Sequence, residues 1–183
     1  YDSTRCTACD ECRAACPIGL APDLNDEKVR RNCTGCGACV TVCLTGARRN
    51  SLYEITVEEA VSALEPQRIF FEQSGGGVTY SGGECTQQAK FLCDLSQTMY
   101  DLGISQTMET SGYFELDRIR PVLERVDLLF IDIKMMDRER HKYYTGVDNT
   151  LILKNIRTLG AEEKQIVIRI PLIMGVNGDD ENV

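Results

Sequence analysis

The chain has 183 residues, of which 43% are hydrophobic and 26% are charged. This composition is typical of a globular protein, and the length is enough for one small domain and one medium domain. The formal net charge of −8 argues against nucleic-acid binding, because Lys and Arg are too few to neutralise phosphates. We find no apolar run of membrane-spanning length and no signal-peptide pattern, so we expect no membrane association and a cytoplasmic location.

Eight of the ten cysteines lie within the first 43 residues. They form two runs with the spacing C-x2-C-x2-C-x3-C, and the second run begins 27 residues after the first. This is the spacing of bacterial ferredoxins with two [4Fe–4S] clusters, in which the fourth cysteine of each run ligates the other cluster. We therefore predict one cluster on Cys6, Cys9, Cys12 and Cys43, and a second cluster on Cys33, Cys36, Cys39 and Cys16.

Zinc is the main alternative ligand for these cysteines, since paired C-x2-C units also suit a tetrahedral zinc site. A zinc site does not need three cysteines at successive intervals of three and a fourth beyond them. A disulfide scaffold would not explain the regular spacing either. Residues 1–50 are accordingly predicted to form a small ferredoxin-like α+β domain that carries electrons.

Helices and strands alternate in the rest of the chain, which we predict to be a second domain over residues 51–183. Thr56 to Glu59 has the pattern of a capping box, which predicts a helix from there to about Leu64, closed by Pro66. Apolar spacing predicts further helices over 87–102, over 116–125 with a break or kink at Pro121, and over 137–159 with an interruption. Strands are expected at 78–80, 104–109, 126–132 and 166–170.

Four strands separated by helices imply right-handed crossovers and a parallel sheet, and thus an α/β fold. The strand over 126–132 is apolar almost throughout. Such a run is expected when helices cover both faces of a parallel sheet.

The stretch from Ser74 to Glu84, SGGGVTYSGGE, is rich in glycine around a short strand. Glycine weakens a strand, which is tolerable where a ligand or another backbone must come close. Gly82 and Gly83 leave their backbone N–H and C=O groups exposed at the carboxyl end of the strand, where α/β sheets place ligands. Glu84 adds a carboxylate suited to an ammonium group, whereas a phosphate loop would carry Lys and Ser or Thr after its glycines.

Polar side chains end the other predicted strands as well. The carboxyl ends of parallel strands meet at one edge of a sheet, so we expect these groups to form a single site. They are Glu109, Thr110 and Ser111 after the second strand, Asp132 and Lys134 after the third, and Arg169 after the fourth. The only histidine, His141, is expected to have a structural role at the surface or in a helix cap.

Five segments of the chain resemble the activating enzymes of glycyl-radical enzymes, which belong to the radical S-adenosylmethionine (SAM) superfamily. They are SGGGVTYSGGE, METSGY (108–113), FIDIK (130–134), TGVDN (145–149) and RIPLIMGVN (169–177). The larger members of this family carry a two-cluster ferredoxin-like insert before the second strand of a partial β/α barrel. The resemblance covers essentially the whole chain and predicts a partial radical SAM β/α barrel that lacks its first and last strands.

This resemblance also implies an activity. SAM bound to a third, site-differentiated [4Fe–4S] cluster is cleaved by one electron to methionine and a 5′-deoxyadenosyl radical. The radical takes a hydrogen atom from one glycine of a partner protein, the glycyl-radical enzyme. A flavodoxin or ferredoxin-type protein would donate the electron, and the activating enzyme would be a monomer.

The family's motifs assign roles to residues at matching positions. Gly82, Gly83 and Glu84 resemble the GGE motif that holds the methionine amino group of SAM. The segment Asp132-Ile133-Lys134 matches the D-x-K motif near the methionyl end.

Two further assignments follow from the same resemblance. Glu109 and Thr110 resemble an acid–Thr pair that lines the SAM site, although the best-known member of the family has Asp in place of this Glu. Arg169 is assigned either to the SAM site or to a position that faces the glycine loop of the partner.

One departure from the family concerns the C-x3-C-x2-C motif that binds the catalytic cluster, which this sequence does not contain. Cys85 and Cys93 are eight positions apart and cannot replace it. We therefore expect the chain to be part of a longer enzyme and to be inactive alone. The alternative is a non-catalytic iron–sulfur electron-transfer protein with a vestigial α/β domain, although such a carrier has no use for the SAM-site residues.

Overall fold

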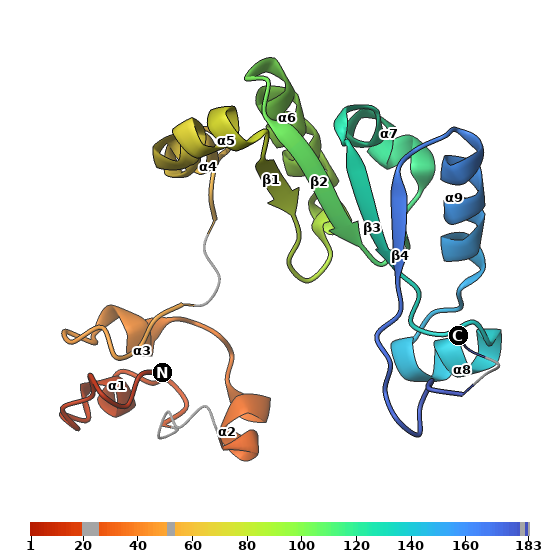
Figure 1. Ribbon diagram of the computed structural model, residues 1–183. Coiled ribbons are helices and arrows are strands. Elements are labelled where there is room, and N and C mark those ends of the chain that lie inside the picture. The colour runs from red at the N-terminus through yellow and green to blue at the C-terminus, as the bar shows by residue number, and fades with distance from the viewer. Residues whose placement is uncertain (20–25, 51–53, 180–181, 183) are drawn as a thin grey trace. The chain divides into compact units, whose positions relative to one another are not determined.

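The computed structural model describes residues 1–19, 26–50, 54–179 and 182 (Figure 1). The chain divides into two compact units, Tyr1–Glu54 and Ile55–Val183. This division lies close to the boundary after residue 50 that the sequence suggests.

The first unit contains three short helices: α1 (Glu11–Ala14), α2 (Glu27–Asn32) and α3 (Ala38–Thr41). Its described residues, 1–19 and 26–50, contain no strand, so the expected α+β character is not seen there. Within the first cysteine loop, left-handed backbone at Ala8 and Asp10 interrupts any extended run.

The 27-residue repeat of the sequence is also a repeat of the backbone. The helices α1 and α3 occupy equivalent positions, 11–14 and 38–41. Left-handed residues precede both helices, Asp10 with φ 59° before α1 and Gly37 with φ 75° before α3. Two residues earlier, Ala8 (φ 55°) and Gly35 (φ 70°) also match. The two cysteine runs therefore have the same local fold.

The second unit begins with the capping box that the sequence predicts. The Glu59 N–H donates to Thr56 Oγ1 (3.2 Å) and the Thr56 N–H donates to Glu59 Oε2 (2.8 Å), which opens α4 (Val57–Leu64). Pro66 does not end the helical path. It lies in a short 3₁₀ helix, Glu65–Gln67, where a missing N–H costs little, and the chain continues into α5 (Arg68–Ser74). The helix α5 was not predicted from the sequence.

The remaining helices lie close to their predicted positions. They are α6 (Ala89–Asp101), α7 (Leu116–Arg125), α8 (Arg138–Thr145) and α9 (Thr150–Ala161), with a 3₁₀ helix, Cys85–Gln88, before α6. The helix α7 runs through Pro121 without the expected break. The proline removes one hydrogen bond in the middle of α7, while Ile119, Val122 and Leu123 are fully buried and hold the helix in place.

Four strands form one parallel sheet in the order β1-β2-β3-β4. They are β1 (Gly77–Tyr80), β2 (Ser105–Thr110), β3 (Leu128–Asp132) and β4 (Ile166–Arg169). The predicted α/β fold with a parallel sheet is confirmed.

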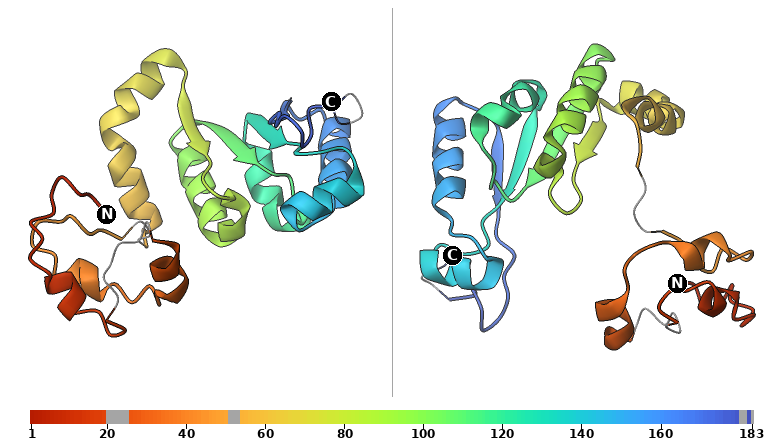
Figure 2. Two further views of the ribbon diagram at one scale, coloured as in Figure 1. Left: turned by 90° about the horizontal axis from the view of Figure 1, so that it is seen from below. Right: turned by 180° about the vertical axis from the view of Figure 1, so that it is seen from behind.

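Helices cover one face of this sheet rather than both. Strands that follow one another in order, joined by right-handed crossovers, carry their helices on the same face. Figure 2 shows α6, α7 and α9 on one side of the strands. Along β3, Leu129 and Ile131 are buried, whereas Leu128 and Phe130 on the other face are only partly buried. The expectation of helices on both faces was therefore wrong.

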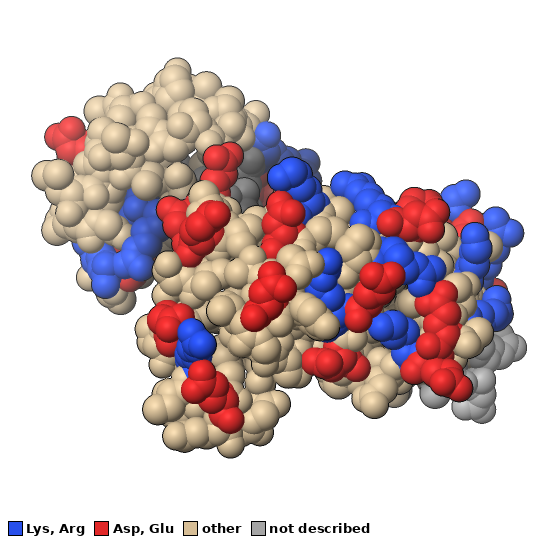
Figure 3. Space-filling model, turned by 90° about the horizontal axis from the view of Figure 1, so that it is seen from above, with Lys and Arg blue, Asp and Glu red and all other residues tan. Residues whose placement is uncertain are grey.

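The core lies between these helices and the sheet. Its fully buried side chains come from α6, α7, α9 and the central strands, and include Met99, Met108, Ile119, Leu123, Leu129, Ile131 and Leu159. On the face of the molecule in Figure 3, acidic and basic side chains are interspersed. No helix in the described part of the chain is both long enough and apolar enough to cross a lipid bilayer.

Candidate functional site

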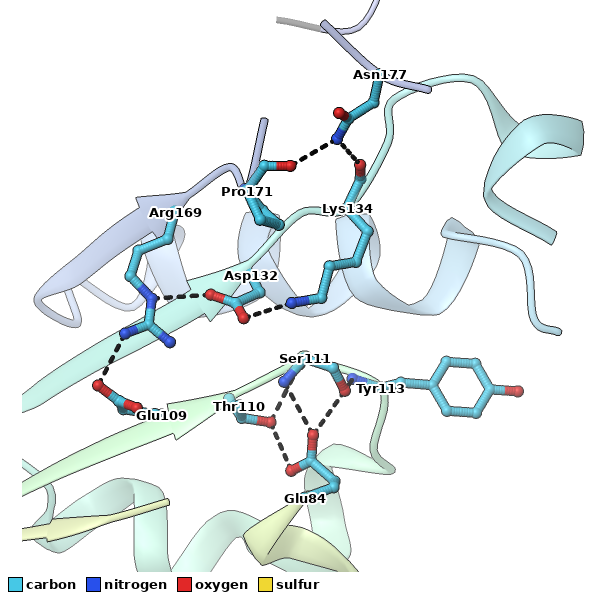
Figure 4. Close-up of polar contacts among 11 residues, drawn as sticks. Glu84, Glu109, Thr110, Ser111, Tyr113, Asp132, Lys134, Arg169, Pro171 and Asn177 are labelled. Atoms are coloured by element: carbon cyan, nitrogen blue, oxygen red, sulfur yellow. Dashed lines mark hydrogen bonds and ion pairs between the residues drawn. The ribbon is translucent and has the colours of Figure 1, made fainter. Parts of the chain in front are cut away.

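The strand-end residues predicted from the sequence gather at the carboxyl edge of the sheet (Figure 4). The strand β2 ends with Glu109 and Thr110, and the register places Asp132 of β3 directly beside Arg169 of β4. The polar contacts at this edge fall into two groups. One surrounds the carboxylate of Glu84 and the other surrounds the guanidinium of Arg169.

The Glu84 carboxylate accepts five hydrogen bonds from N–H and O–H groups of the protein itself. Its Oε1 accepts from the Thr86 N–H (3.2 Å), the Thr86 hydroxyl (2.8 Å) and the Thr110 hydroxyl (2.8 Å). Its Oε2 accepts from the Ser111 N–H (2.9 Å) and the Ser111 hydroxyl (2.6 Å). Since a carboxylate offers about four lone-pair sites, these donors satisfy it completely. The group therefore fastens the glycine-rich turn after β1 to the end of β2.

The same donors fix the charge of Glu84. Partial burial would raise its pKa, but the hydrogen bonds from Ser111, Thr86 and Thr110 outweigh burial and hold the pKa below its ordinary value. The adjacent Cys85 thiol donates to the Glu109 carbonyl (3.5 Å), and burial together with the Glu84 charge raises its pKa to about 11. At neutral pH, Glu84 is thus an anion and Cys85 a neutral thiol.

The Arg169 guanidinium joins the carboxylates of two strands. Its Nε donates to Asp132 Oδ1 and its Nη1 donates to Glu109 Oε1, both at 2.8 Å. The second oxygen of Asp132 accepts from Lys134 Nζ at 2.6 Å. The Arg169 Cζ also lies 5.2 Å from the centroid of the Phe130 ring. Two cations and two anions therefore form a set with no net charge.

These four charged side chains remain open to solvent. Their side chains are 21% exposed for Asp132, 35% for Glu109, 38% for Arg169 and 41% for Lys134. Burial would raise the pKa of Asp132, but the hydrogen bonds and charges of Lys134 and Arg169 lower it overall. A zwitterionic ligand can exchange partners with such pairs without changing the net charge of the site.

The glycines of the turn leave their backbone open. Gly82 has φ 107°, a conformation that L side chains rarely adopt, and nothing lies within 4 Å of the position that a Cβ would take at Gly82 or Gly83. Ile133 is different, because it is 8% exposed and its N–H donates to the Arg169 carbonyl (3.0 Å). Of the segment Asp132-Ile133-Lys134, only the flanking side chains belong to the polar contacts in Figure 4.

Ser111 lies at this edge, as expected for a residue at the end of a strand, whereas Thr86 and Asn177 contribute to the edge without having been predicted. Asn177 is 2% exposed, and its Nδ2 donates to the carbonyls of Lys134 (2.7 Å) and Pro171 (2.9 Å). It thereby ties the segment after β3 to the segment after β4, and no sequence pattern indicated this.

His141 is buried, with 2% of its surface exposed, so the expected surface position was wrong. Its Nδ1–H donates to the Val147 carbonyl (2.7 Å), just beyond the end of α8. This bond closes the turn at Gly146, which agrees with the capping role.

In the first unit, the cysteines predicted to hold one cluster line one cavity of about 270 Å³. These are Cys6, Cys9, Cys12 and Cys43, so the fourth cysteine of the second run lies with the first three of the first run. Within residues 1–19, 26–50, 54–179 and 182, no three His, Cys, Asp or Glu side chains converge as a single metal ion requires. The four thiols instead surround a space far larger than one water molecule, which suits a polynuclear cluster better than a single zinc ion.

Backbone amides point at the first sulfur of each run. The Ala8 N–H donates to Cys6 Sγ (3.4 Å) and, at the equivalent position, the Gly35 N–H donates to Cys33 Sγ (3.5 Å). A hydrogen bond from the Tyr1 side chain, together with the Ala8 amide and the Arg48 charge, lowers the pKa of Cys6. Such donors favour the thiolate form that binds metals, and they tune the potential of iron–sulfur clusters.

Comparison with known proteins gives a match for the first unit and further matches over the whole chain. Residues 1–44 match the family model described as a 4Fe-4S dicluster domain. Over the whole chain, the sequence is 38% identical to the trans-4-hydroxy-L-proline dehydratase activating enzyme of Clostridioides difficile, of which it covers 62%. Over 98% of the chain, it is 38% identical to the (2S)-3-sulfopropanediol dehydratase activating enzyme of Klebsiella oxytoca, of which it covers 57%.

A solved structure agrees with these relatives. A domain of a pyruvate-formate lyase-activating enzyme from Bacteroides vulgatus matches with a TM-score of 0.54 and 39% identity, over 58% of this chain and 66% of that one. The chain thus spans about three fifths of the length of the curated relatives it matches. These comparisons agree with one another, and the chain is similar to the activating enzymes of glycyl-radical enzymes.

Proposed function

We propose that the chain takes part in activating a glycyl-radical enzyme by radical SAM chemistry. In this proposal, residues 1–50 hold two [4Fe–4S] clusters that carry electrons, and residues 51–183 bind SAM. When bound, SAM and its cluster supply a 5′-deoxyadenosyl radical that takes a hydrogen atom from a glycine of the partner. The cysteine motif for that third cluster is not within this sequence.

The observation that carries the proposal is the convergence of Glu84, Asp132, Lys134 and Arg169 at one edge of the sheet in a chain similar to activating enzymes. The methionyl end of SAM has an ammonium and a carboxylate. Lys134 and Arg169 offer cations for the carboxylate, and they are partly exposed. The open backbone of Gly82 and Gly83 offers carbonyls for the ammonium.

Within this site we assign Glu84 to positioning. Its five hydrogen bonds hold the turn that presents Gly82 and Gly83, and its negative charge lies next to them. The other polar side chains of the proposed SAM site are those of Glu109, Thr110 and Asp132. Ile133 is buried beside them.

The partner and the electron donor are proposed only as classes. The relatives include activating enzymes of dehydratases, a decarboxylase and lyases, so the partner is a glycyl-radical enzyme of unspecified chemistry. A flavodoxin or a ferredoxin-type protein would supply the electron to a monomer in the cytoplasm, where thiols stay reduced and available to iron.

Two measurements on the chain test the proposal. After anaerobic reconstitution, we expect about eight irons and about eight sulfides per chain, from two cubane clusters. Amide hydrogen exchange with and without millimolar SAM should then show protection confined to residues 82–84, 109–111 and 132–134. Replacing Lys134 by Met should weaken this protection, while the exposed Lys90→Met variant should retain it.

The outcomes separate the two functions. Two clusters with SAM protection at the strand ends support the activating function. Two clusters without protection at any SAM concentration would leave the electron-transfer protein, and zinc in place of iron would exclude both.

A further inference from the structure

Arg48 is a buried cation without a hydrogen-bond partner at two of its nitrogens. It is 8% exposed, and within the described residues its Nε and Nη1 are buried and make no hydrogen bond. Burying a guanidinium is costly unless it is paired and hydrogen-bonded. The contact that the structure gives it is with the Tyr1 ring, whose centroid lies 4.4 Å from Arg48 Cζ.

The side chain lines the same cavity as Cys6, Cys9, Cys12 and Cys43. Three other charged residues line this cavity, Asp10, Glu11 and Arg13, and all three are exposed. Arg13 Nε and Asp10 Oδ1 form an ion pair at 3.9 Å. Solvent screens these exposed charges. The buried charge at the cavity is therefore that of Arg48, and a counter-charge placed in the cavity would compensate it.

We propose that Arg48 is the electrostatic partner of the [4Fe–4S] cluster on Cys6, Cys9, Cys12 and Cys43, and that it raises the reduction potential of this cluster. The inference rests on the clusters of the proposed function. A cubane held by four thiolates is an anion, and it gains one further negative charge when a low-potential donor reduces one of its irons. A nearby buried cation stabilises the reduced form more than the oxidised form, and net charge is one of the determinants of cluster potential.

This effect is confined to one of the two clusters. The repeat places residue 21 at the position equivalent to Arg48, and the sequence has an alanine there. The second cysteine run also has uncharged residues, Gly37, Ala38 and Val40, where the first run has Asp10, Glu11 and Arg13. Removing the charge of Arg48 should therefore change one potential and leave the other in place.

The test is a redox titration of the whole reconstituted chain with dithionite, followed by electron paramagnetic resonance. In Arg48→Gln, we expect the midpoint potential of one cluster to fall by at least about 59 mV, the value for a tenfold change in a one-electron couple. At a fixed solution potential, the ratio of reduced to oxidised cluster would then be at least tenfold lower. Arg48→Lys keeps the charge and should restore most of the shift. Arg49→Gln is the matched control, because Arg49 is exposed and donates to the Gly46 carbonyl (3.1 Å).

Iron counting separates failure of this inference from failure of the proposed clusters. About eight irons with unchanged potentials in Arg48→Gln would overturn the role of Arg48 alone, as would equal shifts in the Gln and Lys variants. If Arg48→Gln binds only half of the iron, the Arg48→Lys variant distinguishes the two explanations. Full iron and a native potential in Arg48→Lys would support the role of the charge. Half of the iron in Arg48→Lys would overturn that role. A wild-type chain without cubane clusters would overturn the proposed function itself.

Discussion

The Ser111 hydroxyl and the Ser111 N–H both donate to the same oxygen of Glu84, at 2.6 and 2.9 Å. Twenty-seven positions separate the two residues in the chain. The pair therefore connects the turn after β1 with the loop after β2, and it closes the carboxyl edge of the sheet at that point. Hydrogen bonds to a charged, partly buried acceptor are stronger than neutral ones.

Removing either side of this pair should destabilise the second unit. For Ser111→Ala, we expect the free energy of unfolding to fall by about 2 kcal/mol, since one charge-assisted hydrogen bond is lost. Glu84→Gln should cost a similar amount, and the double variant should cost less than the sum because both changes remove the same contact. Urea unfolding followed by circular dichroism measures this, with the exposed Ser81→Ala as control. If the loss of unfolding free energy in the double variant equalled the sum of the two single losses, the coupling of Glu84 and Ser111 would be contradicted.

The lowered pKa of Glu84 gives its contribution to stability a defined pH dependence. The group binds protons less readily in the folded chain, so its contribution is fully present above its ordinary pKa of 4.5 and is lost as pH falls through the lower folded value. The difference in unfolding free energy between the wild type and Glu84→Gln should shrink below about pH 4.5. Both proteins carry the same cysteines, so any metal lost at low pH changes the stability of both by the same amount. Two parallel curves from pH 7 to pH 4 would contradict the assignment.

Asn155 of α9 holds the loop that follows Ser111. It is fully buried, and its Nδ2 donates to the carbonyls of Gly112 (2.9 Å) and Phe114 (2.7 Å). Asn155→Ala leaves both carbonyls without this donor and should lower the free energy of unfolding by about 3 kcal/mol. Amide exchange should become faster around residues 111–114. The neighbouring exposed Lys154→Ala should change neither quantity, and equal effects of the two variants would count against the tether.

Gly112 and Gly160 should respond oppositely to the same substitution. Gly112 has φ 76°, and a Cβ there would lie 2.9 Å from Ile131 Cγ2 and 3.2 Å from Ile152 Cγ2. Gly112→Ala should therefore cost about 3 kcal/mol through backbone strain and overpacking. At Gly160, in α9, nothing lies within 4 Å of the added carbon, so Gly160→Ala should stabilise by about 0.5 kcal/mol. Thermal unfolding of the two variants compares them directly.

The sequence predicted the strands of the second unit well because each is short and bounded by turn residues, and because β3 and β4 are mainly apolar. It also predicted which side chains meet at the sheet edge, since the carboxyl ends of parallel strands lie together. The helix α5 was missed because Pro66 indicates a helix end, and only the structure shows that the proline begins a new turn.

The hydrogen-bond partners of Glu84 could not be predicted in the same way. Which donors fill its oxygens depends on residues 26 and 27 positions away and on the register of β1 and β2. His141 illustrates the same limit. A single histidine in a polar segment reads as a surface residue, and its burial follows from the turn at Gly146 that places the Val147 carbonyl next to its ring.

The position of Cys43 beside Cys6, Cys9 and Cys12 has a consequence for the life of the protein in the cell. The helix α2 and most of the second cysteine run lie between these ligands along the chain. A metal core bound by all four thiols would close that long loop as a disulfide does, and would remove much of the freedom of the unfolded chain. Iron starvation would open the loop, so that proteolytic turnover of this part of the chain would follow the supply of iron.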